Sequence, residues 1–430
     1  MTQLIAEERD WLVCHDCGSL QTIVPISKDL QMVCNYCEKP LHIGRGAWLE
    51  KASAFALTAI ILFVSCNAFN FLTLKVAGIE QQATILSGVA ILIDGEKWIL
   101  AALVFITIFL LPLLEGLALL YLLLPYKLNF RLPGQIRVFR WLITLQPWIM
   151  LDVFLLGVFV TTVKLGDKAT VVLGPGMYLF FLLVAALRMS YWLMDKNNIW
   201  SWLYSNNCFS HDKHELLYDC SVCNAMVGES IVDIEGGCPR CQSKMYKRIP
   251  QSIQKTSALI IAAIILYVPA NIYPIMLYEE LGINYDSTIV GGVVELAENG
   301  LWVIALVVFG ASVIVPIAKL VMLIYLVWSV HVKMKTGAKH RAILHRLTEI
   351  IGRWSMVDVF VVTLLTAVVQ FGFLGVVEPG AALLPFAAVV VLTMIAAETF
   401  DPRLIWDDYG GDDPSNTNTR TLSELEKLAD

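Results

Sequence analysis

Charged residues are scarce in this sequence of 430 residues. Only 16% of the residues are Asp, Glu, Lys or Arg, whereas an ordinary soluble domain contains about 25%. Hydrophobic residues make up 57% of the chain, and the mean hydropathy is +0.67. One soluble core cannot enclose so much apolar surface, so we expect it to be buried in lipid. The formal net charge of -6 disfavours nucleic-acid binding, because that function favours a basic face.

Common catalytic and energy-coupling motifs are also absent. No GxxxxGK[ST] loop occurs, so ATP is not the expected energy source. No HExxH or GxSxG pattern occurs either, and we therefore expect that the protein is not an enzyme. The first residues lack the basic region, apolar stretch and cleavage site of a secretory signal peptide. We expect no cleavable signal and an N-terminus in the cytosol.

Long apolar stretches are abundant. A helix needs roughly 20 apolar residues to cross the hydrocarbon core of a bilayer. Eight stretches reach this length, and they predict an all-α polytopic membrane protein with eight transmembrane helices. The expected spans are 52–74, 98–124, 141–163, 174–194, 257–277, 301–330, 354–376 and 380–399.

The loops between these spans differ in Lys and Arg content. The loops 125–140 and 331–353 are basic, whereas 278–300 has neither residue and 75–97 has only Lys75 and Lys97. Cytosolic loops carry an excess of Lys and Arg. This bias predicts that both termini, including the polar tail 407–430, lie in the cytosol.

The apolar region contains an internal repeat with an offset of 204–206 residues. The segment "LFVSCNAFNFLTLKVAGI" (62–79) corresponds to "LYVPANIYPIMLYEELGI" (266–283), and "PWIMLDVF" (147–154) corresponds to "RWSMVDVF" (353–360). Four spans in each half predict a parallel repeat, an arrangement that transporters use. The expected domains are a zinc ribbon (1–48), a first four-helix half (49–205), a second zinc ribbon (206–250), a second four-helix half (251–406) and the tail.

Eight of the ten cysteines form four CxxC pairs. Sixteen residues separate the two pairs of the first module, and fourteen polar or β-prone residues separate those of the second. Two such pairs supply four thiolates in a tetrahedron, which is typical of structural zinc and leaves no open position for catalysis. Iron is the less favoured alternative, because it accepts the same ligands. The expected ligands are Cys14, Cys17, Cys34 and Cys37 in the first module, and Cys220, Cys223, Cys238 and Cys241 in the second. Cys66 and Cys208 are interpreted as ordinary small residues.

Ionisable residues within the spans are further candidates for function. Charged groups inside a membrane are costly and usually face the protein interior. In the second half, Lys319 and Asp358 are candidates for a buried ion pair, although Asp358 could instead pair with Arg353. Helical spacing and depth add three more residues, so that a polar pocket or relay is predicted from Ser312, Lys319, Ser355, Asp358 and Thr393.

The first half differs at this place. Glu115 replaces Lys319, so Glu115 and Asp152 would share the site as two acids unless Arg188 reaches them. Two neighbouring buried carboxylates tend to hold one proton. A structural cluster that only locks the helices together is an equal alternative for both sets.

Several motifs resemble the paraquat-inducible protein A family. They are the paired CxxC modules, "VPANIYPI" (268–275), "GRWSMVDVFV" (352–361) and "TFDPRLIWD" (399–407), and the resemblance covers roughly residues 10–408. It implies a protein of the Gram-negative inner membrane that works with a periplasmic MCE-domain partner in lipid trafficking and envelope integrity. The first half lacks the equivalents of Arg353 and Ser355, which favours the second half as the working site.

The preferred hypothesis is a lipid-transport subunit that loads phospholipid into a periplasmic MCE tunnel, or unloads it. A proton passing through the Lys319–Asp358 cluster could supply energy. Two alternatives remain: a self-contained secondary transporter of a small solute, and a membrane redox or metal-sensing protein.

Overall fold

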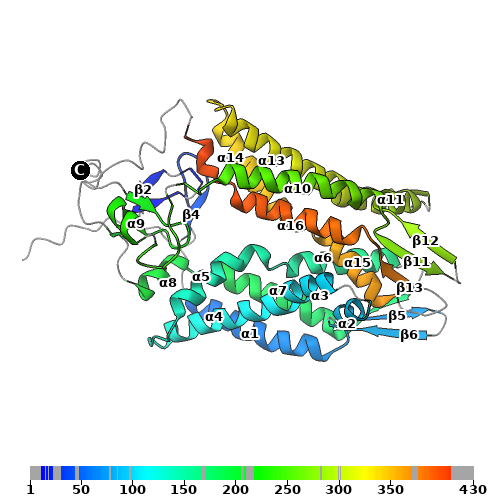
Figure 1. Cartoon of the computed structure of the whole chain (residues 1–430). Coiled ribbons are helices and arrows are strands. Elements are labelled where there is room, and N and C mark those ends of the chain that lie inside the picture. The colour runs from blue at the N-terminus through cyan, green and yellow to red at the C-terminus, as the bar shows by residue number, and fades with distance from the viewer. Residues whose placement is uncertain are drawn as a thin grey trace, which may run out of the picture.

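The computed structural model of the chain is mostly helical (Figure 1). It describes residues 11–14, 16–17, 19–22, 31–43, 48–76, 79–84, 86–95, 98–165, 170–204, 208–209, 217–235, 237–246, 248–280, 283–298, 300, 302–369 and 376–407. The expected tail therefore lies, apart from Asp407, outside the described residues, as does the expected N-terminal segment before Trp11.

The first half is a helical bundle with one small sheet. Its elements are α1 (Trp48–Ala68), β5 (Leu72–Val76), β6 (Ile79–Ala83), α2 (Ser87–Asp94), α3 (Trp98–Phe105), η1 (Ile106–Leu110), α4 (Leu111–Lys127), α5 (Gln135–Leu145), η2 (Gln146–Trp148), α6 (Leu151–Leu165), β7 (Thr170–Leu173), α7 (Pro175–Leu193) and α8 (Lys196–Leu203). The α1 and α7 helices pack along each other.

The second half has its helices and strands in nearly the same order. They are α10 (Ser252–Ile272), β11 (Met276–Glu280), β12 (Ile283–Ser287), α11 (Ile289–Glu298), α12 (Trp302–Phe309), η3 (Gly310–Ile314), α13 (Val315–His331), α14 (Ala338–Trp354), α15 (Val357–Val368), β13 (Val376–Pro379), α16 (Leu383–Thr399) and η5 (Pro402–Ile405). Here α10 and α16 are the closely packed pair. The duplication inferred from sequence stays a prediction.

Six helical segments in the described chain are long and apolar enough to cross a membrane: Trp48–Ala68, Trp98–Lys127, Gln135–Thr162, Pro175–Leu193, Ser252–Ile272 and Gly310–His331. They overlap the first six expected spans. The seventh and eighth do not reach this length, because α15 has 12 residues and α16 has 17. Residues 370–375 of the expected seventh span lie outside the description. Eight spanning helices therefore remain a prediction.

Two expected spans were placed too far toward their C-termini. The predicted stretches 52–74 and 257–277 run into strands, since α1 ends at Ala68 and α10 ends at Ile272. The strands that follow form two three-stranded antiparallel sheets, ordered β6-β5-β7 and β12-β11-β13. These sheets lie at one end of the helices (Figure 1). The third expected span, 141–163, is also interrupted, by η2 between α5 and α6.

Glycine permits each sheet to close against the end of its first helix. A Cβ on Gly174 would lie 2.1 Å from the carbonyl oxygen of Asn70, and one on Gly380 would lie 2.2 Å from that of Pro274. No side chain fits at such an approach, so only glycine serves at these two places.

A wide turn interrupts the second span of each half. The π-helical segments η1 and η3 each end two residues before a proline, Pro112 or Pro316. Proline has no N–H and its ring clashes with the carbonyl of residue i−4, which a π-turn accommodates. The N–H of Leu111 accordingly donates to the carbonyl of Ile106, and that of Val315 donates to Gly310.

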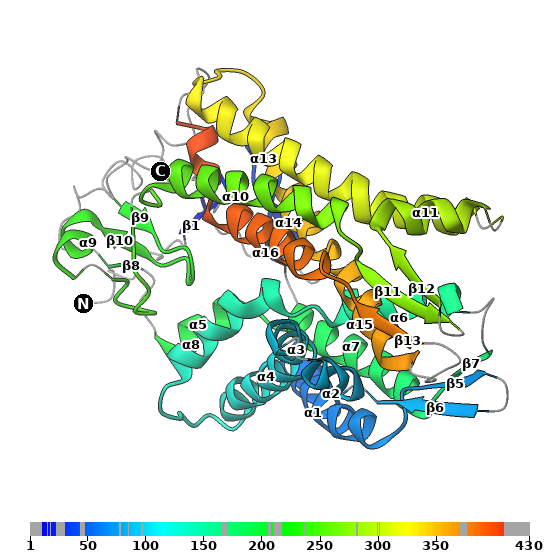
Figure 2. The ribbon, with the colours of Figure 1, turned by 45° about the vertical axis from the view of Figure 1, so that its right-hand side comes forward.

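The two halves meet through α6 and α15, which lie between the other helices of the two halves (Figure 2). Phe154 and Phe360 pack edge to face there, with ring centroids 5.7 Å apart. Gly157 allows the close approach, because a Cβ at this position would lie 3.2 Å from the Cβ of Phe360. The joint is therefore apolar and tightly packed.

The cysteine modules lie together at the end of the helices opposite the sheets (Figure 1). The first module consists of two hairpins, β1–β2 (Trp11–Val13, Leu20–Thr22) and β3–β4 (Gln31–Val33, Pro40–Ile43). The second has the strands β8 (Cys208–Phe209), β9 (Leu217–Asp219) and β10 (Met226–Gly228). Its β-prone segment is not wholly a hairpin, because the short helix α9 (Glu229–Glu235) follows β10.

Candidate metal centres and buried polar sites

Each module brings its four expected cysteines together. The four sulfur atoms of each group lie within 4.8 Å of one another, and all eight side chains are buried. The Sγ–Sγ distances are 3.4 Å for Cys14–Cys37 and 3.6 Å for Cys17–Cys34. Tetrahedral zinc with bonds of about 2.3 Å separates its sulfur ligands by about 3.8 Å. The thiolate groups therefore fit a metal ion with only a small adjustment.

The backbone around these cysteines forms tight turns. In the first module the N–H of Cys34 donates to the carbonyl of Lys39, and the N–H of Glu38 donates back to Cys34. In the second module Cys220 and Cys238 make the same contact, with Ala225 and Ser243. The residue after the second cysteine is left-handed in three turns, at Glu38, Asn224 and Gln242. These turns aim both sulfurs of a pair at one point.

The thiols of each group share hydrogen bonds, and these bonds separate their pKa values. They lower the pKa of the Cys34 and Cys220 thiols and raise the pKa of the Cys17 and Cys223 thiols. Thiolates are the form that binds metal. Cys66, by contrast, is buried alone in α1 and donates to the carbonyl of Phe63, as expected of an ordinary small residue. The side chain of Cys208 lies outside the description.

Each module packs against the half that it does not precede in sequence. Cys14, Cys17, Cys34 and Cys37 share an apolar cluster with second-half residues such as Leu326, Phe400 and Trp406. The cysteines of the second module instead join the cluster that contains Phe139 and Trp200 of the first half. This crossed docking ties the two halves together on the module side.

Two arginines at equivalent positions hold the modules. Arg346 on α14 donates to the carbonyl of Cys37 at 2.8 Å and to the carboxylate of Asp16 at 2.6 Å. Lys39 also pairs with Asp16. Burial would raise the pKa of Asp16, but the charges of Lys39 and Arg346 outweigh it and lower that pKa. In the first half, Arg140 on α5 donates to the carbonyls of Cys241 and Gln242, at 3.2 and 2.9 Å.

Lys319 is the most deeply buried of the predicted polar residues in the second half. Its side chain is 1% exposed, and within the described chain no group accepts a hydrogen bond from its amine. The amine lies against Gly352, where an added Cβ would be 2.8 Å away. The predicted Lys319–Asp358 ion pair is therefore not formed in this structure.

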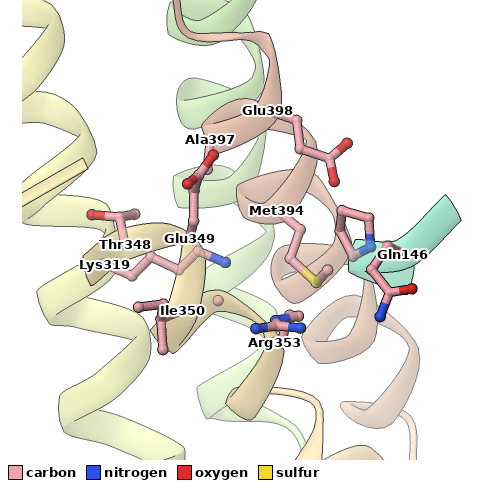
Figure 3. Close-up of a pocket in the computed structure, with 11 residues that line it drawn as sticks. Gln146, Lys319, Thr348, Glu349, Ile350, Arg353, Met394, Ala397 and Glu398 are labelled. Carbon is pink, nitrogen blue, oxygen red and sulfur yellow. The ribbon is translucent and has the colours of Figure 1, made fainter. Parts of the chain in front are cut away.

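Lys319 instead lines a cavity of about 260 Å³ that the two halves share. Glu349 and Arg353 of α14, Glu398 of α16 and Gln146 of η2 also line it. Figure 3 shows the Lys319 amine with the two glutamates toward one end of the cavity and Arg353 toward the other. The site thus combines one buried amine with two acids and an arginine that line the same cavity.

Ser312 and Asp358 lie elsewhere. Both line a smaller cavity of about 40 Å³, together with Ser287 at the end of β12 and Thr288, which follows it. Ser355 is buried between α14 and α15, and Thr393 donates to the carbonyls of Val389 and Val390 in its own helix. The five predicted residues thus do not line one cavity: Lys319 belongs to one, and Ser312 and Asp358 to another.

In the first half, Arg188 reaches one of the two acids. It lies 3.5 Å from Asp152 and donates to the carbonyl of Ile149 at 2.9 Å. Glu115 is 2% exposed, and in the described part of the molecule neither of its carboxylate oxygens accepts a hydrogen bond. Arg188 therefore reaches Asp152, as the sequence analysis allowed, but it forms no ion pair with Glu115.

Glu349 and Glu398 were not among the residues predicted from the sequence. Glu349 lies in a basic loop between expected spans, and Glu398 lies at the last turn of the eighth span. For Glu349 a signal exists, because it precedes Arg353 by four residues and so shares its helix face. Glu398 carries no such signal, since its spacing of five from Thr393 does not place the two on one face. Only the fold shows that both reach the Lys319 cavity.

Comparison with known proteins agrees with this architecture. The chain is 31% identical to Intermembrane transport protein PqiA of Escherichia coli K12 over 92% of its own length and 95% of the relative. It is 29% identical to Lipophilic envelope-spanning tunnel protein A of the same organism, covering 93% and 92%. A probable intermembrane transport protein of Haemophilus influenzae is 28% identical, covering 95% and 98%.

Two of these relatives are named as intermembrane transport proteins and the third as a tunnel protein. No solved structure matches the chain. The family model described as Paraquat-inducible protein A matches residues 49–204 and 253–410, which leaves out both cysteine modules. The two matched segments together cover most of the sequence, and the protein therefore belongs to the paraquat-inducible protein A family.

Proposed function

We propose that this protein is the inner-membrane subunit of an intermembrane lipid-transport system. It loads phospholipid into a periplasmic MCE-domain tunnel, or unloads it, and thereby maintains the cell envelope. The similarity to a protein named Intermembrane transport protein over 92% of this chain carries the proposal. The apolar helices support a multi-pass membrane protein.

The proposed topology has eight spans with both termini in the cytosol. The loops rich in Lys and Arg support it. In this topology the cysteine modules lie in the cytosol and the small sheets lie on the periplasmic side, where a tunnel partner would dock. Zinc is the proposed metal, because four thiolates in a closed shell suit it. Its role is structural: the metal keeps each module rigid enough to clamp the opposite half.

The Lys319 cavity is the proposed working site of the second half. A buried amine without a fixed partner can take up or release a proton when a ligand or a helix moves. Glu349 and Glu398 are the acids that share its cavity. Ser312 and Asp358 line a second polar cavity, which lies nearer to the small sheet of this half. Ser355 and Thr393 are buried where the helices pack. We infer that protons pass in two steps, through the cavity of Ser312 and Asp358 and through the Lys319 cavity, and not through a single Lys319–Asp358 ion pair.

Lipid exchange tests this function. Vesicles that contain the purified protein and labelled phospholipid are mixed with the soluble domain of its MCE partner, and lipid transferred to the partner is measured. Transfer should be much faster than from vesicles without the protein, and Lys319→Met should abolish the gain. Lys335→Met, which removes an exposed lysine near the end of the same helix, is the matched control and should transfer normally.

Two other outcomes would replace the proposal. Uptake of a small solute by protein-only vesicles, with no transfer to the partner, would identify a self-contained transporter. A reversible redox change with iron in the cysteine modules would identify a redox protein.

A further inference from the structure

A groove of about 320 Å³ lies between α4 and α5 of the first half, separate from the Lys319 cavity. Leu111 and Leu114 of α4 line one wall, and Trp141 and Leu145 of α5 line the other. The helical spacing of three and four residues places each set on one helix face. The groove is therefore largely apolar, with the side chains of an amphipathic helix on one side.

Glu115 is the buried acid in this groove. The carboxylate is 2% exposed, and no donor among the described residues satisfies either oxygen. Arg188, a basic group of the same bundle, is engaged elsewhere, because it contacts Asp152 and the carbonyl of Ile149. A buried carboxylate without donors is costly. A ligand that brings N–H donors and a positive charge would complete it.

Arg137 is the cation of the same groove. It is exposed near the start of α5 and lies two helical turns, about 12 Å, before Leu145. A guanidinium group binds phosphate well. Trp141, one turn further on, is 62% exposed, as is usual for a tryptophan at the level of lipid headgroups. The groove thus offers an anion site at its rim and a carboxylate in its interior.

We propose that this groove binds a phospholipid with an ethanolamine headgroup from the cytosolic leaflet. The ammonium donates hydrogen bonds to Glu115, Arg137 holds the phosphate, and the acyl chains lie along the leucines and Trp141. A primary ammonium has three N–H donors, whereas the quaternary ammonium of a choline lipid has none. The groove therefore selects ethanolamine over choline.

The second half does not repeat this combination. The residue equivalent to Glu115 is Lys319, and the residue equivalent to Arg137 is Ile343. A lipid site of this kind accordingly belongs to the first half alone. The inference deepens the proposed function by naming a lipid class, and it rests on that function only for the role of the bound lipid, not for binding itself.

Photocross-linking in nanodiscs tests the site. The full chain is reconstituted with a trace of ethanolamine or choline phospholipid that carries the same photoreactive acyl chain. Cross-links on residues 111–149 are then quantified by mass spectrometry. In the unmodified protein, ethanolamine lipid should label this segment at least about tenfold more than choline lipid, the factor expected from charge-assisted hydrogen bonds.

Two variants separate the two ends of the headgroup. Glu115→Gln keeps the side-chain size and should bring the ethanolamine-to-choline ratio close to one. Arg137→Gln should lower labelling by both lipids and leave their ratio unchanged. Glu50→Gln and Lys127→Gln remove exposed charges of the same half and should behave like the unmodified protein. Size-exclusion profiles confirm that each variant is folded.

An unchanged ratio in Glu115→Gln, or no preference in the unmodified protein, would overturn the inference. Glycerophosphoethanolamine, which has no acyl chains, should not compete with cross-linking, and effective competition would mean that the ligand is a soluble headgroup compound. Lipid transfer to the MCE partner is a separate measurement. Its failure would reject the proposed function while leaving the headgroup preference standing.

Discussion

The two halves place different charges at equivalent positions. The first half has Glu115 on α4 and Arg188 on α7, whereas the second has Lys319 on α13 and Met394 on α16. Arg188 contacts Asp152, and this pair is partly exposed. Lys319 is buried with no acceptor among the residues that the structure describes. A similar bundle thus holds an ion pair with an unsatisfied acid in one half and an unsatisfied base in the other.

Two similar helical bundles can therefore serve separate tasks. A buried amine in a cavity shared by both halves suits a step that changes charge, whereas a carboxylate in a groove beside an exposed arginine suits headgroup recognition. The docking of the cysteine modules also differs between the two halves. Arg346 holds the first module through Asp16, but the residue equivalent to Asp16 in the second module is Val222.

The largest expected effect comes from the cysteines. Replacing Cys37 or Cys241 by Ser removes one of four ligands, and structural zinc contributes an apparent free energy of about 10–16 kcal/mol in small modules. Either variant should lower bound metal from two ions to one per chain, measured by elemental analysis, and should expose its module to protease. Cys66→Ser, within α1, should retain both ions. Full metal content in Cys37→Ser would contradict the ligand assignment.

The second effect concerns Lys319. Lys319→Met should leave the melting temperature unchanged or raise it, because an unpaired buried amine costs free energy. It should nevertheless lower lipid exchange at least about tenfold, the range in which single proton-transfer groups act. The double variant Lys319→Glu with Met394→Arg transplants the charges of the first half and should also be folded and inactive. Normal exchange by either variant would show that the two halves do not differ in this way.

The third effect compares the two docking arginines. Arg346→Ala should destabilise the first module by about 1.5–3 kcal/mol, because hydrogen bonds to a charged group are lost. Arg140→Ala removes hydrogen bonds from a charged guanidinium to two neutral carbonyls, without a carboxylate partner, so its loss should lie at the lower end of that range. Limited proteolysis against denaturant concentration measures both values. A larger loss for Arg140→Ala would reverse the ranking that Asp16 and Val222 predict.

The smallest effect is expected at the ion pair of the first half. Asp152→Asn keeps the shape of the side chain, and the pair is partly exposed, so the change in unfolding free energy should be roughly 0–1 kcal/mol. Thermal unfolding in detergent measures it. A loss of several kcal/mol would mean that Asp152 also supports Glu115, and the two halves would then be more alike than their contacts indicate.

The sequence predicted the cysteine sites well because their chemistry is local. The spacing within each CxxC turn fixes two ligands, and all eight cysteines are grouped as expected. The first six spans were also predictable, since long apolar segments carry their own signal. The strands β5 and β11 were missed because "LTLKV" and "MLYEE" follow directly on apolar helices, and their pairing with β7 and β13 depends on residues about 100 positions away.

The polar sites were only partly predictable for a related reason. Burial depth could be estimated from position along a span, and Glu115 and Lys319 are indeed buried. The sequence did not show which side of each helix faces the interior or how α14 packs. Lys319 was therefore grouped with Asp358 and not with Glu349 and Glu398. The sequence analysis named Arg188 as the base that could reach the two acids, and Arg188 does contact Asp152. A cation within reach of two acids is the simplest way to neutralise one of them.

The proposed role of Lys319 in lipid transfer can be measured with vesicles that contain the protein, labelled phospholipid and the soluble MCE partner, with and without Lys319→Met. We expect rapid transfer with the unmodified chain and transfer at the protein-free rate with Lys319→Met. Transfer at the protein-free rate with the unmodified, metal-loaded chain would contradict it.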